Sequence, residues 1–130
     1  MVNDPIGDMI IQIKNAGMSR KRVIEIPCSN LKEQVAGILV REKYLESVKR
    51  VGVAPREKLS ITLKFISGDP LITGVKRISK PGLRWYVKKS AIPTVAGGSG
   101  IVVISTPKGV MTGKDAEKNG FGGEVICEIW

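Results

Sequence analysis

Charged, aromatic and hydroxyl residues in suggestive positions lie in the C-terminal half of the chain. Between Pro70 and Lys114 the sequence has eight Lys or Arg and no Asp or Glu. Ordinary surfaces intersperse both signs, so this segment indicates a polyanionic partner, although a merely solvated strand face is the alternative. Six of the cations flank Pro81-Gly82, where we expect a hairpin whose side chains follow phosphates. They are Lys76, Arg77, Lys80, Arg84, Lys88 and Lys89.

Two aromatic residues lie among these cations. Side chains alternate between the two faces of a strand, so Tyr86 should share a face with Arg84 and Lys88. A ring between cations can stack on an RNA base while its neighbours bind phosphates. The alternative is a tyrosine that only covers the edge of the sheet. Trp85 should point to the opposite face, and we expect it in the core.

A third candidate is the segment Ser105-Thr106-Pro107-Lys108-Gly109, which follows an apolar strand. Hydroxyl groups both donate and accept hydrogen bonds, so such a turn suits base edges, the ribose 2′-OH and phosphate. A plain strand-exit turn is the alternative. The same letters spell Ser-x-x-Lys, the pattern of a lysine-activated serine nucleophile, but the companion motifs of such enzymes are absent. We therefore expect no catalysis here.

Composition excludes several other classes of function. The 130 residues carry a net charge of +9 with a pI near 9.8, which indicates nucleic acid or an anionic membrane surface as partner. The chain has no His, and Cys28 and Cys127 are far apart in the sequence. We therefore expect buried free thiols and neither a metal nor a cofactor. The longest apolar run, residues 101–104, is too short to span a membrane.

The elements that must position these residues fall into two groups. In the first, we expect a helix that is capped by Asn3 or Asp4 and ends at Gly17, then a strand at 22–26. A second helix should follow, with Asn30 and Glu33 as its capping pair. Two more strands are expected at 44–51 and 59–65.

The turn signal at 67–70 separates this group from a segment that is almost all strand. Strands are expected at 71–79, 84–88, 101–106 and 124–130, with a short helix capped by Thr112 and Asp115. The run at 101–104 is apolar on both faces, so its strand should be central. Gly97-Gly98-Ser99-Gly100 precedes a strand, so it reads as a turn and not as a phosphate cradle. The predicted fold is α+β: an N-terminal α/β lobe at 1–67 and a C-terminal, mostly antiparallel lobe at 68–130.

Several segments together resemble small-subunit ribosomal protein eight of the bacterial type. The similarity runs along the whole chain and is most specific at 76–84 and 105–112. It is supported by Asp4-Pro5-Ile6, by Ile13-Lys14-Asn15-Ala16 and by Gly122-Gly123-Glu124.

The resemblance implies a structural protein, not an enzyme, that binds the central domain of small-subunit rRNA and helps its assembly. The implied RNA-binding residues are Ser105, Thr106, Lys108 and Gly109, flanked by Tyr86, Gly122, Gly123 and Glu124, in addition to the six cations. Glu124 should orient a donor or accept a hydrogen bond from a base. The first lobe should add Asp4, Pro5, Lys14, Asn15 and Lys21. Other implied partners are neighbouring small-subunit proteins and the mRNA of the protein's own operon.

Two departures from the family pattern reduce the expected contacts. Pro107 stands where a third hydroxyl residue is usual, and it lacks both a side-chain donor and a backbone N–H. In the first helix Gln12 and Lys14 stand where Arg is common, and lysine cannot form the two-pronged phosphate contact of a guanidinium group.

The implied location is the cytoplasm, within the small subunit, or the stroma or matrix of an organelle. Three alternatives remain open at this point. They are an mRNA-binding repressor that never enters a ribosome, a serine acyl-transferase and a peripheral membrane protein.

Overall fold

The computed structural model describes residues 4–95 and 99–130. Asn3, Gly97 and Gly98, for which the sequence suggested a cap and a turn, lie outside these ranges. Contacts divide the chain into an N-terminal unit, residues 8–73, and a C-terminal unit, residues 1–7 with 74–130. The division falls six residues after the boundary expected from the sequence, and it assigns the start of the first helix to the C-terminal unit. No described helix is long and apolar enough to cross a membrane.

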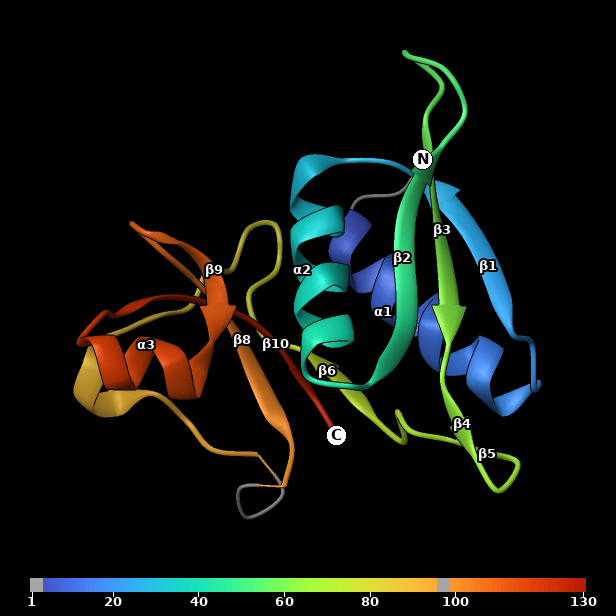
Figure 1. Ribbon diagram of the computed structural model, residues 1–130. Helices are drawn as coiled ribbons and strands as arrows, with labels where there is room; N and C mark the ends of the chain where they lie inside the picture. The colour runs from blue at the N-terminus through green and yellow to red at the C-terminus, as the bar shows by residue number, and fades with distance from the viewer. Residues whose placement is uncertain (1–3, 96–98) are drawn as a thin grey trace. The chain divides into compact units, whose positions relative to one another are not determined.

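The N-terminal unit is a three-stranded antiparallel sheet with helices on one side (Figure 1). The sheet order is β1-β3-β2, and a small β4/β5 ladder follows β3. Met9, Ile10 and Ile13 of the first helix are buried, as are Leu59 and Ile61 of β3. The elements are α1 (Pro5–Met18), β1 (Val23–Pro27), α2 (Asn30–Arg41), β2 (Leu45–Val51), β3 (Lys58–Leu63), β4 (Phe65–Ile66) and β5 (Asp69–Pro70).

The two long helices begin at side-chain caps. The Asp4 carboxylate accepts a hydrogen bond from the backbone N–H of Gly7 at 3.2 Å, which satisfies a free donor of the first turn of α1. For α2 the expected capping pair of Asn30 and Glu33 is wrong. Ser29 is the N-cap, and its hydroxyl accepts from the N–H of Lys32.

The C-terminal unit is a five-stranded antiparallel sheet with one short helix. Its path runs β6-β10-β8-β9, with β7 also paired to β10. β8 lies inside the sheet, and Val102, Val103 and Ile104 are all buried, which confirms the expected central strand. The elements are β6 (Val75–Arg77), β7 (Tyr86–Val87), the 3₁₀ turn η1 (Lys89–Ala91), β8 (Ile101–Thr106), β9 (Gly109–Thr112), α3 (Gly113–Asn119) and β10 (Gly123–Ile129).

The helix α3 begins and ends where the sequence indicated. The Thr112 hydroxyl accepts from the N–H of Asp115 at 3.1 Å, and Gly120 takes the left-handed conformation that ends the helix. The described residues form three α-helices and antiparallel sheets in two units, which confirms the α+β class.

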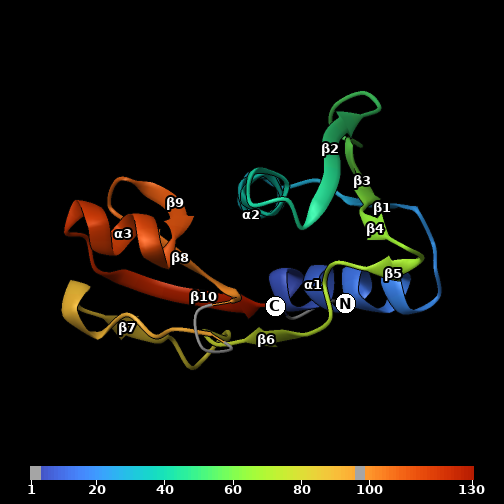
Figure 2. The ribbon, with the colours of Figure 1, turned by 60° about the horizontal axis from the view of Figure 1, so that its bottom comes forward.

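The expected hairpin around Pro81-Gly82 is confirmed only at its tip, where Lys80 and Leu83 pair antiparallel, because β6 and β7 do not pair with each other. β6 pairs with residues 127–129 of β10 and β7 with residues 123–124, so the two segments follow one another along the same edge of β10 (Figure 2). The chain between them leaves the sheet as a loop, closed by two 2.9 Å backbone hydrogen bonds between Lys80 and Leu83. The loop therefore interrupts an edge strand.

Two predictions about burial are also corrected. Trp85 was expected in the core, but 55% of its surface is exposed. The core cluster on that side of the sheet is made of smaller side chains, among them Val102, Ile104 and Val125. Of the two cysteines, Cys127 is fully buried and Cys28 is partly exposed, and both are free thiols.

Candidate nucleic-acid interface

Four residues form a row across the C-terminal sheet. Tyr86 pairs with Glu124, Glu124 pairs with Ser105, and Ser105 pairs with Val110. Directly opposed residues of neighbouring strands share one face of a sheet. The row therefore brings together, from three strands, the phenol of Tyr86, the carboxylate of Glu124 and the hydroxyl group of Ser105, which lie far apart in the sequence. Tyr86 is 70% exposed, so its ring is free to stack on a ligand.

An ion pair sets the charge of this row. Arg84 Nη1 lies 3.1 Å from a carboxylate oxygen of Glu124, with the arginine half exposed and the glutamate more covered. The pairing offsets the negative charge that would otherwise repel phosphate, and the single charge-assisted hydrogen bond restrains the Glu124 carboxylate beside the guanidinium group. A carboxylate held in this way can accept a hydrogen bond from a base. Arg84 therefore forms an ion pair with Glu124 within the protein, in addition to the contact with RNA phosphates that the sequence suggested.

The turn after β8 is held by one buried hydroxyl group. Thr106 is only 8% exposed, and its Oγ1 donates to the carbonyl of Gly109 at 2.8 Å and accepts from the N–H of Lys108 at 3.1 Å. Gly109 has a φ of +121°, which favours glycine. The Thr106 hydroxyl is thus committed to the turn, while Pro107 and Lys108 are exposed at its tip.

Gly122 and Gly123 have a packing role at this site. A Cβ atom on Gly123 would lie 2.1 Å from the carbonyl oxygen of Ser105, and one on Gly122 would lie 2.5 Å from that of Val87. Both distances are far inside van der Waals contact. The glycines therefore allow β7 and β8 to approach the start of β10, and this approach creates the row.

The six cations do not gather on one surface. Lys76 pairs with Glu128, and Glu128 pairs with Val102, three residues from Ser105 along β8. An odd spacing in a strand places side chains on opposite faces, so Lys76 lies on the face opposite the row. A β-bulge between Val125 and Cys127 explains why Glu124 and Glu128 point to different sides.

Arg77 is used inside the protein. Its Nε lies 3.1 Å from an Asp4 carboxylate oxygen, its Nη1 donates to the carbonyl of Ile126 at 2.7 Å, and its side chain is only 13% exposed. The same carboxylate caps α1. Asp4 and Arg77, both expected to bind RNA, thus join the start of the chain to β6 and β10. Pro5 occupies the first position of α1.

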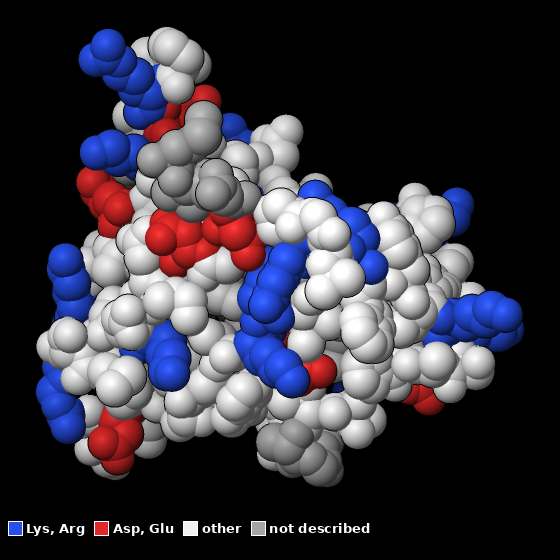
Figure 3. Space-filling view, turned by 180° about the vertical axis from the view of Figure 1, so that it is seen from behind, with Lys and Arg blue, Asp and Glu red and all other residues white. Residues whose placement is uncertain are grey.

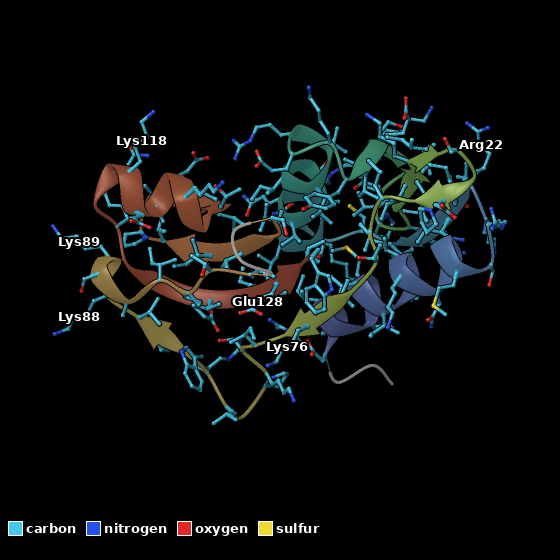
Figure 4. The ribbon with its side chains drawn as sticks, turned by 90° about the horizontal axis from the view of Figure 1, so that it is seen from below. Arg22, Lys76, Lys88, Lys89, Lys118 and Glu128 are labelled. Carbon is cyan, nitrogen blue, oxygen red and sulfur yellow. The ribbon has the colours of Figure 1, made fainter. Side chains whose placement is uncertain are left out.

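The remaining cations are exposed. Lys80 lies at the loop between β6 and β7, and Lys88 and Lys89 lie at the beginning of η1. In Figure 4 Lys88 and Lys89 project away from the sheet at the end where Lys118 leaves α3. Figure 3 shows Lys and Arg at several separate places on one face of the molecule, with Asp and Glu between some of them. The charge is distributed over more than the expected hairpin.

Sequence reasoning missed Ser79, which holds the loop between β6 and β7 in place. Ser79 is fully buried, and its Oγ accepts from the N–H of Trp85 at 2.7 Å. This bond closes the base of the loop just before the chain re-enters the sheet with Tyr86. The sequence around Ser79 does not indicate this role, because the hydrogen bond to Trp85 depends on the path that the loop takes.

The expected contacts of the first lobe lie on α1 and the segment after it. Asn15 and Lys21 line one hollow of about 240 Å³ in the N-terminal unit, together with Gln12. Lys14 is half-buried on the same helix. Among residues 4–95 and 99–130, no group of three or more Cys, Asp or Glu side chains could hold a metal ion.

Comparison with known proteins identifies the family. The family model for ribosomal protein S8 matches residues 4–130. The chain is 46% identical over 129 residues to "Small ribosomal subunit protein uS8" of Dictyoglomus turgidum, covering 99% of this chain and 98% of that protein. It is 48% identical to the protein of the same name from Halothermothrix orenii over 130 residues, again 99% and 98% of the two chains. The chain with the Tyr86–Glu124–Ser105 row therefore belongs to the ribosomal protein S8 family, a family of ribosomal structural proteins and not of enzymes.

Proposed function

We propose that this protein is a component of the small ribosomal subunit that binds the central domain of its rRNA and helps the subunit to assemble. The curated relatives are small-subunit proteins by name. The observation that carries the RNA-binding proposal is the row of Tyr86, Glu124 and Ser105 on one sheet face beside the turn tip at Lys108. In this reading the protein acts in the cytoplasm, within the subunit, and it also represses its own operon by binding a similar mRNA structure.

The row and the cations contribute differently to binding. Tyr86 stacks on a base that a bulge or internal loop has exposed, while Ser105 and Glu124 hydrogen-bond to base edges or a 2′-OH. Double-stranded RNA hides its base edges in a deep and narrow major groove, so an irregular helix fits this surface better than a regular one. Lys88, Lys89 and Lys108 bind phosphates without regard to sequence.

A filter-binding salt series tests this division of labour. The RNA is a bulged hairpin from the central domain of small-subunit rRNA, with a fully paired hairpin of equal length as the unrelated RNA. Lys88→Ala should weaken binding to both RNAs and flatten the slope of log K against log salt by about one unit. Ser105→Ala should keep the slope and reduce the preference for the bulged hairpin about fivefold, because only one hydrogen bond is lost.

Lys49→Ala serves as the matched control and should leave both binding curves unchanged, since Lys49 is an exposed lysine on β2 of the N-terminal unit, outside the proposed surface. If Lys88→Ala and Ser105→Ala gave the same profile, the division between affinity and discrimination would be wrong. If the parent protein bound both hairpins equally, the proposed surface would not discriminate at all.

A second candidate function is that of an mRNA-binding repressor outside the ribosome, because the same row could bind an mRNA hairpin. Sedimentation of a cell lysate separates the two. The ribosomal proposal expects the protein in the small-subunit peak at high salt. Recovery only from the light fractions would favour the repressor.

A further inference from the structure

A second concave surface lies in the C-terminal unit, on the side of the sheet opposite the row. It is a groove of about 450 Å³, within the range of about 300–1,000 Å³ typical of small-ligand sites. Its apolar part includes Leu83, Trp85, Val87 and Pro93. Tyr86 does not line it, because consecutive residues of a strand point to opposite faces.

The groove exposes apolar side chains that do not take part in the hydrophobic core. Trp85 is 55% exposed and Leu83 is 63% exposed, and neither belongs to the core cluster. The backbone N–H of Trp85 is held by Ser79 and its carbonyl accepts from the N–H of Val125 at 2.9 Å. The indole is therefore presented by a fixed backbone, although its own burial contributes little to stability. A large exposed aromatic in a groove is typical of a binding site.

Charged groups line the same groove as this indole. Lys76 and Lys80 both line the groove and both are exposed, and Glu128 lines it beside Lys76. Lys76 and Glu128 lie next to each other on neighbouring strands, as Figure 4 shows. An aromatic platform flanked by cations is the arrangement with which proteins hold single-stranded nucleic acid, because every base has a π-face and every nucleotide has a phosphate.

We propose that this groove binds an unstacked base of a single-stranded RNA segment. The base stacks on Trp85, and Lys76 and Lys80 bind the phosphates on either side of it. Glu128 accepts a hydrogen bond from an exocyclic amino group, so the groove prefers adenine or cytosine to uracil. The site goes beyond the proposed contact through Tyr86 and lies on the other face of the same sheet, so one molecule can bind two RNA segments at once.

An acidic peptide with an apolar anchor is the competing ligand, since it would also meet two lysines and an apolar surface. The Glu128 carboxylate repels phosphates and acidic side chains alike, but a base can offer it an exocyclic amino group, which an acidic side chain cannot, and this difference favours RNA. The exposed indole also suits a flat base. Stacking buries one face of each ring, and no long side chain has to lose conformational entropy.

Fluorescence of Trp85 tests the proposal directly. The chain has two tryptophans, so Trp130→Phe provides a background in which Trp85 is the only emitter. Titration with decaadenylate should quench this emission in a saturable manner, and decauridylate should bind more weakly. Trp85→Ala should weaken binding of decaadenylate, measured by anisotropy of a labelled oligonucleotide, at least about fivefold. Glu128→Gln should reduce the preference for adenine.

Two controls separate this site from the row. Tyr86→Ala should leave the quenching curve unchanged, and Trp85→Ala should leave binding of the bulged hairpin unchanged. If Trp130→Phe did not fold, the difference spectrum between the parent and Trp85→Phe would report the same quenching.

Absence of quenching by both oligonucleotides would overturn the proposal, and so would equal loss of decaadenylate binding in Tyr86→Ala and Trp85→Ala. Stronger quenching by an acidic, aromatic-containing decapeptide than by decaadenylate would also overturn it and would assign the groove to a protein partner. Quenching that persists while the bulged hairpin fails to bind would refute the proposed function and leave the groove site standing.

Discussion

Two turns of the C-terminal unit contain similar residues, but they orient different side chains for binding. The turn after β8 has Pro107 and Lys108 at its tip, and the loop after β6 has Pro81 and Gly82. A buried hydroxyl group holds each one. Thr106 bonds twice inside its own turn, whereas Ser79 bonds to the backbone of Trp85 across the base of its loop.

The difference between the turns lies in what each hydroxyl group orients. Thr106 fixes the turn tip beside the row, so the turn acts as a rigid edge of a single surface. Ser79 fixes the point where the chain returns to β10, and there two consecutive aromatic residues point to opposite faces. The turn after β8 therefore positions side chains on one face of the sheet, whereas the loop after β6 positions an aromatic side chain on each face. Variants that disturb each turn separately test whether the two turns have these different roles.

The largest expected effect is that of Gly123→Ala, which disturbs the first turn at its base. The new Cβ would lie 2.1 Å from the Ser105 carbonyl oxygen, so β8 and β10 must separate. We expect the free energy of unfolding to fall by about 3 kcal/mol, measured by urea denaturation. Gly82→Ala is the control, because a Cβ there meets no atom within 4 Å and only its φ of +85° is unfavourable. Equal losses for both would mean that the close approach of the strands is not what matters.

Thr106→Val should cost less. The substitution keeps the shape of the side chain but leaves the carbonyl of Gly109 and the N–H of Lys108 without their partner. We expect a loss of about 2 kcal/mol and weaker binding of the bulged hairpin, with the quenching of Trp85 by decaadenylate unchanged. Thr106→Ser retains the hydroxyl and should restore most of both properties. An effect on Trp85 quenching would show that the two turns are coupled.

Ser79→Ala should have a smaller effect on stability and a broader one on binding. The N–H of Trp85 loses its 2.7 Å hydrogen bond, and the Trp85 carbonyl loses a weak 3.4 Å one but keeps the N–H of Val125, so we expect about 1 kcal/mol. Because the loop orients both aromatic residues, hairpin binding and decaadenylate quenching should weaken together. Ser90→Ala, at an exposed serine of η1, is the matched control. Loss of only one activity would contradict the idea that the loop serves both faces.

The smallest effect concerns the buried thiol of Cys127 in β10, and it appears only above neutral pH. Burial raises the pKa of the Cys127 thiol to about 12, above its usual 9.0. The native state therefore keeps a proton that the unfolded state loses above pH 9, so stability is complete below pH 9 and falls as the pH rises toward 12. The slope is about 1.4 kcal/mol per pH unit. Comparison of the parent with Cys127→Ala by urea denaturation at pH 8 and pH 11 checks this, since the extra loss should vanish in the variant.

Features governed by neighbouring residues could be predicted from the sequence. Pro5 at the first position of a helix, Thr112 with Asp115 and the stop at Gly120 all act within a few residues, and the structure has them as expected. The same holds for the central position of β8, because a strand that is apolar on both faces has to be covered on both. The alternation that separates Tyr86 from Trp85 also follows from the strand period alone.

Partners far apart in the sequence could not be predicted in this way. Asp4 and Arg77 are 73 residues apart, and nothing local indicates that they pair with each other and not with RNA. The pairing of β6 and β7 with β10 is equally non-local. The turn between them suggested a hairpin because short connections usually join paired strands.

Composition, hydrophobic period and helix capping are properties of short segments, so the class of the fold, the excess of positive charge and the candidate RNA-binding residues follow from the sequence alone. Which of those candidates are free to bind RNA depends on how the chain folds. Arg77 and Thr106 are engaged within the protein, Trp85 is exposed and Lys76 lies on the opposite face. The physical reason is that burial, hydrogen bonding and facing direction depend on strand pairing and on one bulge in β10, which join residues distant in the chain.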